Sequence, residues 1–388
     1  MGVDVERMSA AHIDPAREWA AWQPSEPYSV GLEEELMLLD ARDLSLAQRS
    51  DEVLPRLPAE LAPHVSAETH QAAIELATRP HATVGAAIAE LRALRGRVGA
   101  ELARLGLALA GSGTHPFAVW SETRVSPASR YQVILRTMAD LARREPTFAL
   151  HVHVGVPDPE RAVRLLNGLR AHLPVLLGLA ANSPFWQGRA TGLASTRTPV
   201  FGMFPRTGIP RRFASYGDWV DTVDALLRCG AFPEPTFLWW DIRPQPTLGT
   251  VEVRVMDAQS RMQDTAALVA LVHALARLEL EDGLLPAPAA GDDEVLAENR
   301  FLAARDGIEA DLLDPAGGRT VSARAVLDEL LDAARPHADA LGCRDELELV
   351  GGLAGEPGFA RQLDVAARHA GSLPDMLAEL AQGFAPPG

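Results

Sequence analysis

Two glutamates with one residue between them, Glu33 and Glu35, stand in the apolar stretch formed by residues 29–40. We predict that this stretch is a β-strand, in which both carboxylates point the same way, about 7 Å apart. Glu34 falls on the apolar side, which we interpret as a position at the rim of a sheet. Neighbouring carboxylates that lose water stay ionised only beside a positive charge, so the pattern indicates a metal ion or arginines between them.

Three further stretches show the same design, with aliphatic residues on one face and ionisable residues on the other. Their ionisable faces carry His151 and His153, Asp241 and Arg243, and Glu252 and Arg254. If these strands join one sheet, one face packs under helices and the other becomes a charged floor. Massed carboxylates favour Mg²⁺ or Mn²⁺, and arginines beside them favour phosphate or a substrate carboxylate. The combination suits phosphoryl transfer from a nucleotide.

A second acidic segment lies at residues 66–80 and carries Glu68, Gln71 and Glu75. Read as a strand, it puts Gln71 and Glu75 on one face; read as a helix, it brings all three together. By pattern alone a solvated polar face is the simpler interpretation. For His151 and His153, a structural role and contact with metal or phosphate both stay open.

Residues 182–213 form a long stretch without a clean period, and loops of this length inside a domain are usually functional. Its aromatic residues predict an ordered loop. Its arginines are the densest basic group in an acidic chain, and we expect them to bind an anion. They are Arg189, Arg197, Arg206, Arg211 and Arg212.

The chain has 388 residues and a net charge of −16, which argues against nucleic acid or an anionic membrane as the main partner. No apolar run reaches membrane-spanning length, and the first residues lack the apolar core of a signal peptide. Only two cysteines occur, far apart, so we expect a reducing cytoplasm. The chain contains no lysine, which excludes mechanisms that need a Walker or Schiff-base lysine.

The organisation predicted from these patterns is one α+β catalytic domain with additions at both ends. We expect a flexible leader at residues 1–27, the catalytic domain at 28–285, and a helical region at 286–388 packed on the same domain. The Gly111-Ser-Gly113 turn lacks a third glycine at dinucleotide-fold spacing, so a Rossmann interpretation is weak.

The chain carries, in this order, the segments GLEEELMLLD, ETHQAAIEL, GTHPFA, HVHVG, NSPFW, STR, PRTGIP and WWDIRPQPTLGTVEVRVMDA. This set resembles the bacterial carboxylate–amine ligases of the glutamate–cysteine ligase type 2 family. The resemblance implies a glutamine synthetase-like fold, in which a curved, largely antiparallel sheet forms an active-site funnel with helices packed outside. It also implies an ATP-dependent enzyme that joins a carboxylate, often the γ-carboxylate of glutamate, to an amine, often that of cysteine, through an acyl phosphate.

The resemblance also assigns roles to individual residues. Metal ligands would be Glu33, Glu35, Glu68, Glu75 and Glu252, with His151 or His153 near a metal or the nucleotide. Arg254 would contact phosphate, and Arg197 and Arg206 are candidates for the transferring phosphate or the substrate carboxylate. Asp241, Arg243 and Arg254 are candidates for contacts with ATP. The partners would be small amino acids and amines, and a homo-oligomer stays open.

Two other functions are compatible with the same residues. A metal-dependent amide hydrolase would use the carboxylates and histidines without a nucleotide. A non-catalytic relative would bind a nucleotide or an amino acid without releasing ADP. The intact set of acidic residues and Arg254 counts against the second alternative.

Overall fold

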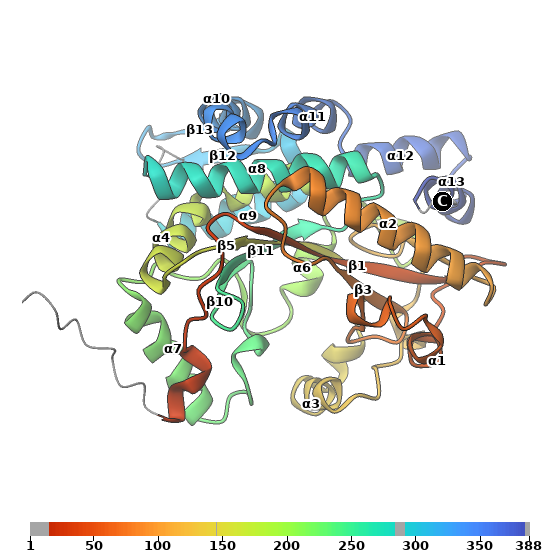
Figure 1. The fold of residues 1–388 in the computed structure, drawn as a ribbon. Helices are drawn as coiled ribbons and strands as arrows, with labels where there is room; N and C mark the ends of the chain where they lie inside the picture. Colours follow the sequence, from red (N-terminus) through yellow and green to blue (C-terminus); the bar gives the residue numbers. More distant parts are fainter. Residues whose placement is uncertain (1–14, 145, 284–291, 385–388) are drawn as a thin grey trace, which may run out of the picture.

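The computed structural model describes residues 15–144, 146–283 and 292–384, and its centre is one antiparallel β-sheet (Figure 1). The strand order is β10-β11-β5-β1-β3-β2, and β4 pairs with the far half of β1. The strands are β1 (Val30–Asp40), β2 (Val65–Ala67), β3 (Ala73–Ala77), β4 (Leu107–Ala110), β5 (Ala149–Gly155), β10 (Ile242–Gln245) and β11 (Thr250–Asp257). The predicted α+β class with a largely antiparallel sheet is confirmed.

One face of the sheet packs under long helices. The helices α2 (Val84–Ala103) and α8 (Met262–Glu281) lie across it, and α10 (Ala323–Leu341) and α11 (Arg344–Gly355) pack on α8 (Figure 1). The aliphatic side of β1 meets this layer and is fully buried, as the alternation predicts; it comprises Val30, Leu32, Leu36 and Leu38. Burial of one sheet face against helices fixes the register, because a slip by one residue would expose these side chains.

Local signals determine where several helices begin. Asp158 caps α4 (Pro159–Leu169) by accepting a hydrogen bond from the backbone of Arg161, and Pro159 occupies the first turn. After a short 3₁₀ turn the chain continues as α5 (Leu173–Ala180). The helical segment that begins after Asp158 is thus interrupted at residues 170–172.

On the other side of the sheet the helices are short and leave space above the charged floor. They include α1 (Ser50–Val53), α3 (Ser129–Met138), α6 (Arg197–Phe201) and α7 (Tyr216–Arg228). In Figure 1, α1, α3 and α7 lie on the side of the sheet opposite α2 and α8. This incomplete cover is what allows a cavity to form over the polar face.

The rim position predicted for Glu34 is wrong. Its side chain is fully buried and forms an ion pair with the equally buried Arg95 of α2, whose Nε donates to Glu34 Oε2 over 2.7 Å. A buried carboxylate remains charged when a guanidinium compensates the lost hydration. Glu34 therefore ties the helical layer to the sheet and takes no part in the charged floor.

The single strand predicted for residues 237–243 is also wrong. The chain forms a 3₁₀ turn, Pro235–Phe237, then β9 (Trp239–Trp240), which pairs in parallel with β8 (Thr207–Gly208). Only β10, which begins at Ile242, belongs to the central sheet. Because Asp241 lies at the break between the two strands, it does not share a sheet face with Arg243.

Both ends of the chain, where they are described, pack on the helices and strands around the central sheet. The predicted leader is described from residue 15; Arg17 pairs with Asp221 and Asp224 of α7, and Trp22 Nε1 donates to the carbonyl of Val156 over 3.1 Å. The first 14 residues, for which flexibility was predicted too, lie outside the described residues.

The C-terminal region consists of α9 (Asp293–Asp306), α10, α11, α12 (Gly358–Arg368) and α13 (Leu373–Gln382), with a hairpin of β12 (Asp311–Asp314) and β13 (Arg319–Ser322) that was not predicted.

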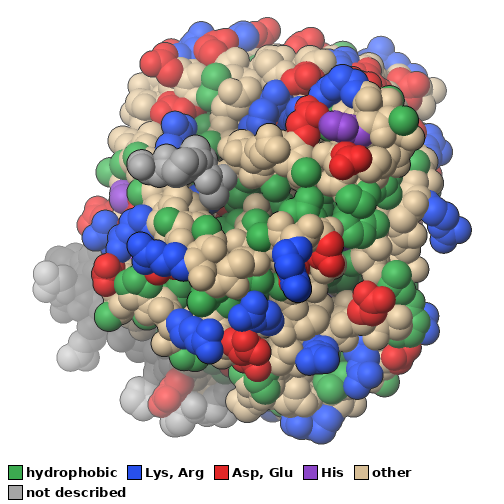
Figure 2. All heavy atoms as spheres, turned by 90° about the vertical axis from the view of Figure 1, so that its right-hand side faces the viewer, with side chains coloured by type: hydrophobic (Ala, Val, Ile, Leu, Met, Phe, Trp, Pro, Cys, Tyr) green, Lys and Arg blue, Asp and Glu red, His purple; other side chains and the backbone are tan. Residues whose placement is uncertain are grey.

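Two surface properties concern nucleic acid and membranes, the partners that the net charge and the sequence argue against. On the face drawn in Figure 2, acidic and basic side chains are interspersed, and no extended basic area is present among the described residues of that face. None of the described helices combines the length and the apolar character that crossing a membrane requires.

His115, in the turn after β4, gives the fold a pH-dependent element. Its Nε2 hydrogen-bonds the carbonyl of Leu44 over 2.8 Å, and its Nδ1 accepts from the backbone of Ala118 over 2.9 Å. Nδ1 is therefore the unprotonated nitrogen, and a second proton would face a backbone N–H group. Burial lowers the pKa of His115 from 6.5 to about 4.

We expect this histidine to destabilise the protein in mild acid. Because the folded-state pKa lies below the unfolded value, stability is complete above about pH 6.5 and is lost as the pH falls toward 4. At pH 5 the loss is about 2 kcal/mol. Urea unfolding of wild type and His115→Gln at pH 7 and pH 5 measures it, since other titrating groups are common to both proteins. Parallel losses in the two proteins would contradict the expectation.

Candidate active site

A cavity of about 460 Å³ opens over the polar face of the sheet. Four of the predicted acidic residues line it: Glu33 and Glu35 from β1, Glu75 from β3, and Glu68 from the segment before β3. The segment around Glu75 is thus a strand, and its polar side faces the cavity instead of bulk solvent. Glu252 and His153 lie just beneath the lining and are almost fully buried.

The strand register explains why residues distant in sequence meet here. Directly opposite each other lie Glu33 and His151, Glu35 and Glu75, His153 and Glu252, and Arg243 and Glu252. Side chains at such cross-strand positions are separated by about 5 Å. Five neighbouring strands therefore place their ionisable faces in one continuous patch, as the shared alternation predicts.

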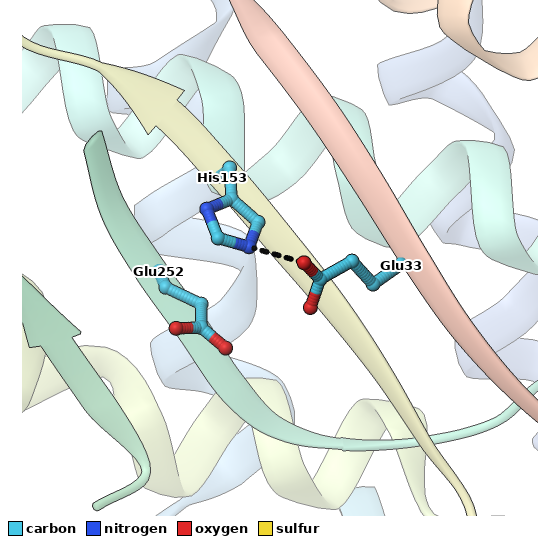
Figure 3. Close-up of side chains that lie close together, drawn as sticks. All are labelled: Glu33, His153 and Glu252. Atoms are coloured by element: carbon cyan, nitrogen blue, oxygen red, sulfur yellow. Dashed lines mark ion pairs between the residues drawn. The ribbon is translucent and has the colours of Figure 1, made fainter. Parts of the chain in front are cut away.

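Three groups of side chains in this patch could hold a metal ion. Within each group, the ligand atoms lie within 4.8 Å of one another. The first group is Glu35, Glu68 and Glu75, the second is Glu33, Glu75 and His151, and the third is Glu33, His153 and Glu252. Figure 3 shows the last group, in which His153 and Glu33 point toward one another and Nε2 lies 3.3 Å from Glu33 Oε1. The oxygen-rich first group suits Mg²⁺ or Mn²⁺.

The two histidines fit such a role. His153 Nδ1 is hydrogen-bonded to Thr250 Oγ1 over 2.9 Å, so Nε2 is the nitrogen that faces the carboxylates. The Nε2 atoms of both His151 and His153 are buried without a hydrogen-bond partner. A hydrogen bond on one imidazole nitrogen commonly orients the other toward a metal. The unpartnered nitrogens are thus consistent with metal ligation.

The electrostatics divide the acidic patch in two. Burial opposes ionisation of Glu33, but His153 and His151 outweigh it and hold the pKa of Glu33 below its usual range. Burial raises the pKa of Glu68 to about 7, with a further contribution from Glu35. Burial and then Glu33 and Glu68 raise the pKa of Glu75 well above its usual range. At the Glu35–Glu68–Glu75 end the nearby Arg254 does not outweigh burial and mutual repulsion, and a divalent cation would supply further positive charge.

Two arginines compensate the buried Glu252. Arg243 Nε donates to Glu252 Oε2 over 2.6 Å, and Arg254 pairs with Glu252 Oε1. Arg254 Nη1 also lies 3.4 Å from His151 Nδ1. Although burial works against it, the proximity of Glu252 and Glu35 raises the pKa of Arg254. Both arginines line the cavity and place their guanidinium groups beside the acidic patch.

Besides Glu252 and His153, three of the predicted site residues do not line the cavity. Asp241 faces α9 and forms an ion pair with Arg300 over 2.5 Å. Arg197 is buried behind β11, where it donates to the carbonyls of Arg254 and Val255 and lies 3.8 Å from Asp257.

Arg206 has a φ of 66° and lies over the rings of Trp239 and Phe232. It touches the cavity only through Trp239, which is part of the lining.

The loop of residues 182–213 does not gather its arginines at one place. Besides the buried Arg197, Arg211 pairs with Asp218 over 2.6 Å, and Arg189 and Arg212 are exposed. The loop nevertheless contributes Phe201 and Phe204 to the cavity wall, as ordered aromatic residues. A basic composition in sequence thus does not make one anion site here.

Several residues of the site were missed by the sequence reasoning. Arg130 and Tyr131, at the start of α3, line the cavity, and neither belongs to a pattern of alternating faces. Gln245 donates to Glu252 Oε2 over 2.5 Å. Since Gln245 lies two residues after Arg243 on the same strand face, extending the alternation by one step would have found it.

Comparison with known proteins places the chain in a family. The family model of glutamate-cysteine ligase family 2 matches residues 29–379. Two proteins of Rubrobacter xylanophilus, with the provisional names glutamate–cysteine ligase 2-1 and 2-3, are 40% and 42% identical over 92% and 93% of this chain, and 95% and 98% of their own lengths.

Two solved structures share the fold. A glutamate–cysteine ligase of Francisella tularensis, solved in complex with AMP, has a TM-score of 0.65 at 13% identity and covers 94% of this chain and 90% of its own. A bifunctional glutathione synthetase of Pasteurella multocida has a TM-score of 0.67 at 16% identity, over 92% of this chain and 52% of its own. The chain therefore belongs to glutamate-cysteine ligase family 2 and is an ATP-dependent ligase that forms carbon–nitrogen bonds.

Proposed function

We propose that this enzyme activates the γ-carboxylate of glutamate with ATP and joins it to an amine such as that of cysteine. The observation that carries the proposal is the convergence of Glu33, Glu35, Glu68, Glu75 and Glu252 with Arg243 and Arg254 around one cavity. Carboxylates that can hold divalent cations, next to fixed guanidinium groups, suit stabilisation of a transferring phosphoryl group. The names of the relatives and of the AMP-bound structural neighbour support the choice of substrates.

The metal ions in this proposal are Mg²⁺, with Mn²⁺ as an alternative. Glu35, Glu68 and Glu75 would hold one ion, and Glu33, His153 and Glu252 would hold another; His151 belongs to the third group, with Glu33 and Glu75. When bound, such ions neutralise phosphate charge and orient the nucleotide. The assignment accounts for the raised pKa values of Glu68 and Glu75, since burial and the neighbouring carboxylates outweigh the effect of Arg254 and a bound cation would add the missing positive charge.

In the first step, a γ-carboxylate oxygen attacks the γ-phosphorus of ATP, and the bond from that phosphorus to the bridging oxygen of ADP breaks. Arg254 faces the cavity and would bind the phosphoryl oxygens as their charge redistributes. Arg197 supports it from behind by donating to its backbone carbonyl, and is therefore a positioning residue. In the second step, the amine nitrogen attacks the acyl carbon, inorganic phosphate leaves, and the amine loses a proton.

The other two arginines and Asp241 have less direct roles in this proposal. Arg243 holds Glu252 and lines the cavity, so it would reach the nucleotide. Asp241 would act through Arg300, and Arg206 would act through the orientation of Trp239. Their replacement is expected to change activity less than replacement of Arg254.

A screen for nucleotide cleavage with isotope labelling tests the proposal. With Mg²⁺, ATP, an acid and an amine, we expect ADP and phosphate in step with an amide product detected by mass spectrometry. If the acid carries ¹⁸O in its carboxylate, one ¹⁸O atom must appear in the phosphate, because an acyl phosphate transfers it. AMP and pyrophosphate would contradict the acyl-phosphate route. Amide cleavage without nucleotide would identify a hydrolase, and nucleotide binding without ADP would identify a non-catalytic binder.

A further inference from the structure

The cations that line the active-site cavity differ in how firmly they are held. Among the described lining residues with a guanidinium group, Arg243 and Arg254 both pair with Glu252, whose side chain is fully buried. Arg130 pairs instead with Glu234, whose side chain is 48% exposed. Breaking a buried pair leaves an uncompensated charge, whereas an exposed pair contributes little and separates readily. Arg130 is therefore the arginine of this cavity that can exchange its partner.

The surroundings of Arg130 fix its orientation without using its full hydrogen-bonding capacity. Its guanidinium carbon lies 4.6 Å from the centre of the Phe237 ring, and Nη1 donates to Thr236 Oγ1 over 2.7 Å. The next residue, Tyr131, donates its hydroxyl to the carbonyl of Ala67, directly before Glu68. Arg130 thus stands at the acidic end of the cavity with its guanidinium group over an aromatic ring. A guanidinium held in this way is arranged to bind a carboxylate through two hydrogen bonds.

We propose that Arg130 binds a carboxylate of an amino-acid substrate that is not activated in the reaction, and that Glu234 occupies this position until the substrate displaces it. The inference rests on the proposed function, in which both substrates are amino acids. Glu234 is itself a carboxylate and lines the same cavity, so it presents to Arg130 the chemical group that the substrate would bring. The carboxylate belongs either to the acid or to the amine substrate, and the experiment separates the two.

Two substitutions have opposite expected effects. Arg130→Met removes the charge and raises the KM of one substrate by about 10- to 100-fold, the range of a charged hydrogen-bonded contact, while kcat changes little. Glu234→Gln removes the internal competitor and lowers the same KM by about 3- to 10-fold, because more of the enzyme is ready to bind. If the pair had a purely structural role, both substitutions would change the KM in the same direction.

The probes are L-glutamate and L-cysteine, each compared with its α-amide, in steady-state kinetics and in titration calorimetry with the intact enzyme. The substrate whose affinity falls in Arg130→Met, while the affinity of its α-amide stays the same, is the one that Arg130 contacts. Arg324→Met is the matched control, since Arg324 forms a similarly exposed pair with Glu309 outside the cavity. It should leave both KM values unchanged and shift the melting temperature about as much as Arg130→Met does.

Several results would overturn the inference. The first is an unchanged affinity of Arg130→Met for both amino acids, and the second is no binding of either amino acid to wild type. The third is weaker binding of ATP to Arg130→Met with the amino-acid affinity preserved, which would show that Arg130 contacts the nucleotide. Failure of the proposed function looks different, because no acid and amine pair would then release ADP even where calorimetry detects binding to Arg130.

Discussion

Glu33→Gln lowers kcat by about 10³-fold while the protein remains folded; this is the first of two large effects that we expect. Glu33 belongs to two of the three groups that could hold a metal, so its loss weakens both. Its side chain is 28% exposed and lies among like charges, which include Glu252 and Glu75. Gln relieves this repulsion but loses the charge that pairs with His151 and His153; because the two effects oppose each other, the free energy of unfolding should change by less than about 2 kcal/mol.

Kinetics over a range of Mg²⁺ concentrations, together with thermal unfolding, measure both parts of this expectation. Glu90→Gln is the matched control, because Glu90 is also a partly buried glutamate bonded to a histidine, His81, but it lies outside the cavity. Near-normal turnover of Glu33→Gln at low Mg²⁺ would show that Glu33 is not a metal ligand. Glu252→Gln would be a poorer test, since it leaves Arg243 and Arg254 buried without their partner and costs about 3–5 kcal/mol.

Arg254→Met is the second variant with a large expected effect, a loss in kcat of about 10³- to 10⁵-fold. An arginine that stabilises the transferring phosphoryl group acts mainly in the transition state, so the affinity for ATP should weaken by less than about 10-fold. Single-turnover ADP formation and titration of ATP binding separate the two quantities. Arg254→Lys keeps the charge but loses the planar guanidinium group with its paired donors, so its kcat should lie between those of Arg254→Met and wild type.

Equal losses in ATP affinity and in the rate of ADP formation would contradict this role of Arg254. Arg197→Met provides a comparison, since Arg197 supports the backbone of Arg254 from outside the cavity. We expect a smaller loss in rate for it than for Arg254→Met, accompanied by a clear loss of stability, because the side chain is buried.

Much of the site was predictable because alternation along a strand is a local property of the chain. Covalent geometry puts Glu33 with Glu35, His151 with His153, and Glu252 with Arg254, whatever the strands pair with. The same reasoning failed at Asp241, where the chain leaves one strand and starts another. A break of this kind depends on the pairing of β9 with β8, about 30 residues earlier, which no local pattern reports.

The partners of single charges were decided by contacts between distant segments. Glu34 looked like a rim residue because its own stretch contains no cation, yet Arg95, 61 residues away, neutralises it inside the core. For a similar reason Arg197 was predicted to belong to the site, whereas Arg130 was missed. Arg197 belongs to a basic loop but is buried behind β11. Arg130 belongs to a helix without a distinctive sequence pattern, and this helix borders the cavity.

Residue types and their spacing along the chain were enough to predict the α+β class, the faces of the strands, the family resemblance and the acidic character of the site. Contacts between remote segments were needed to show which carboxylates share one cavity, which arginines face it, and how firmly each arginine is held. Strand order and side-chain burial depend on this long-range packing, and the charge state of each residue follows from it.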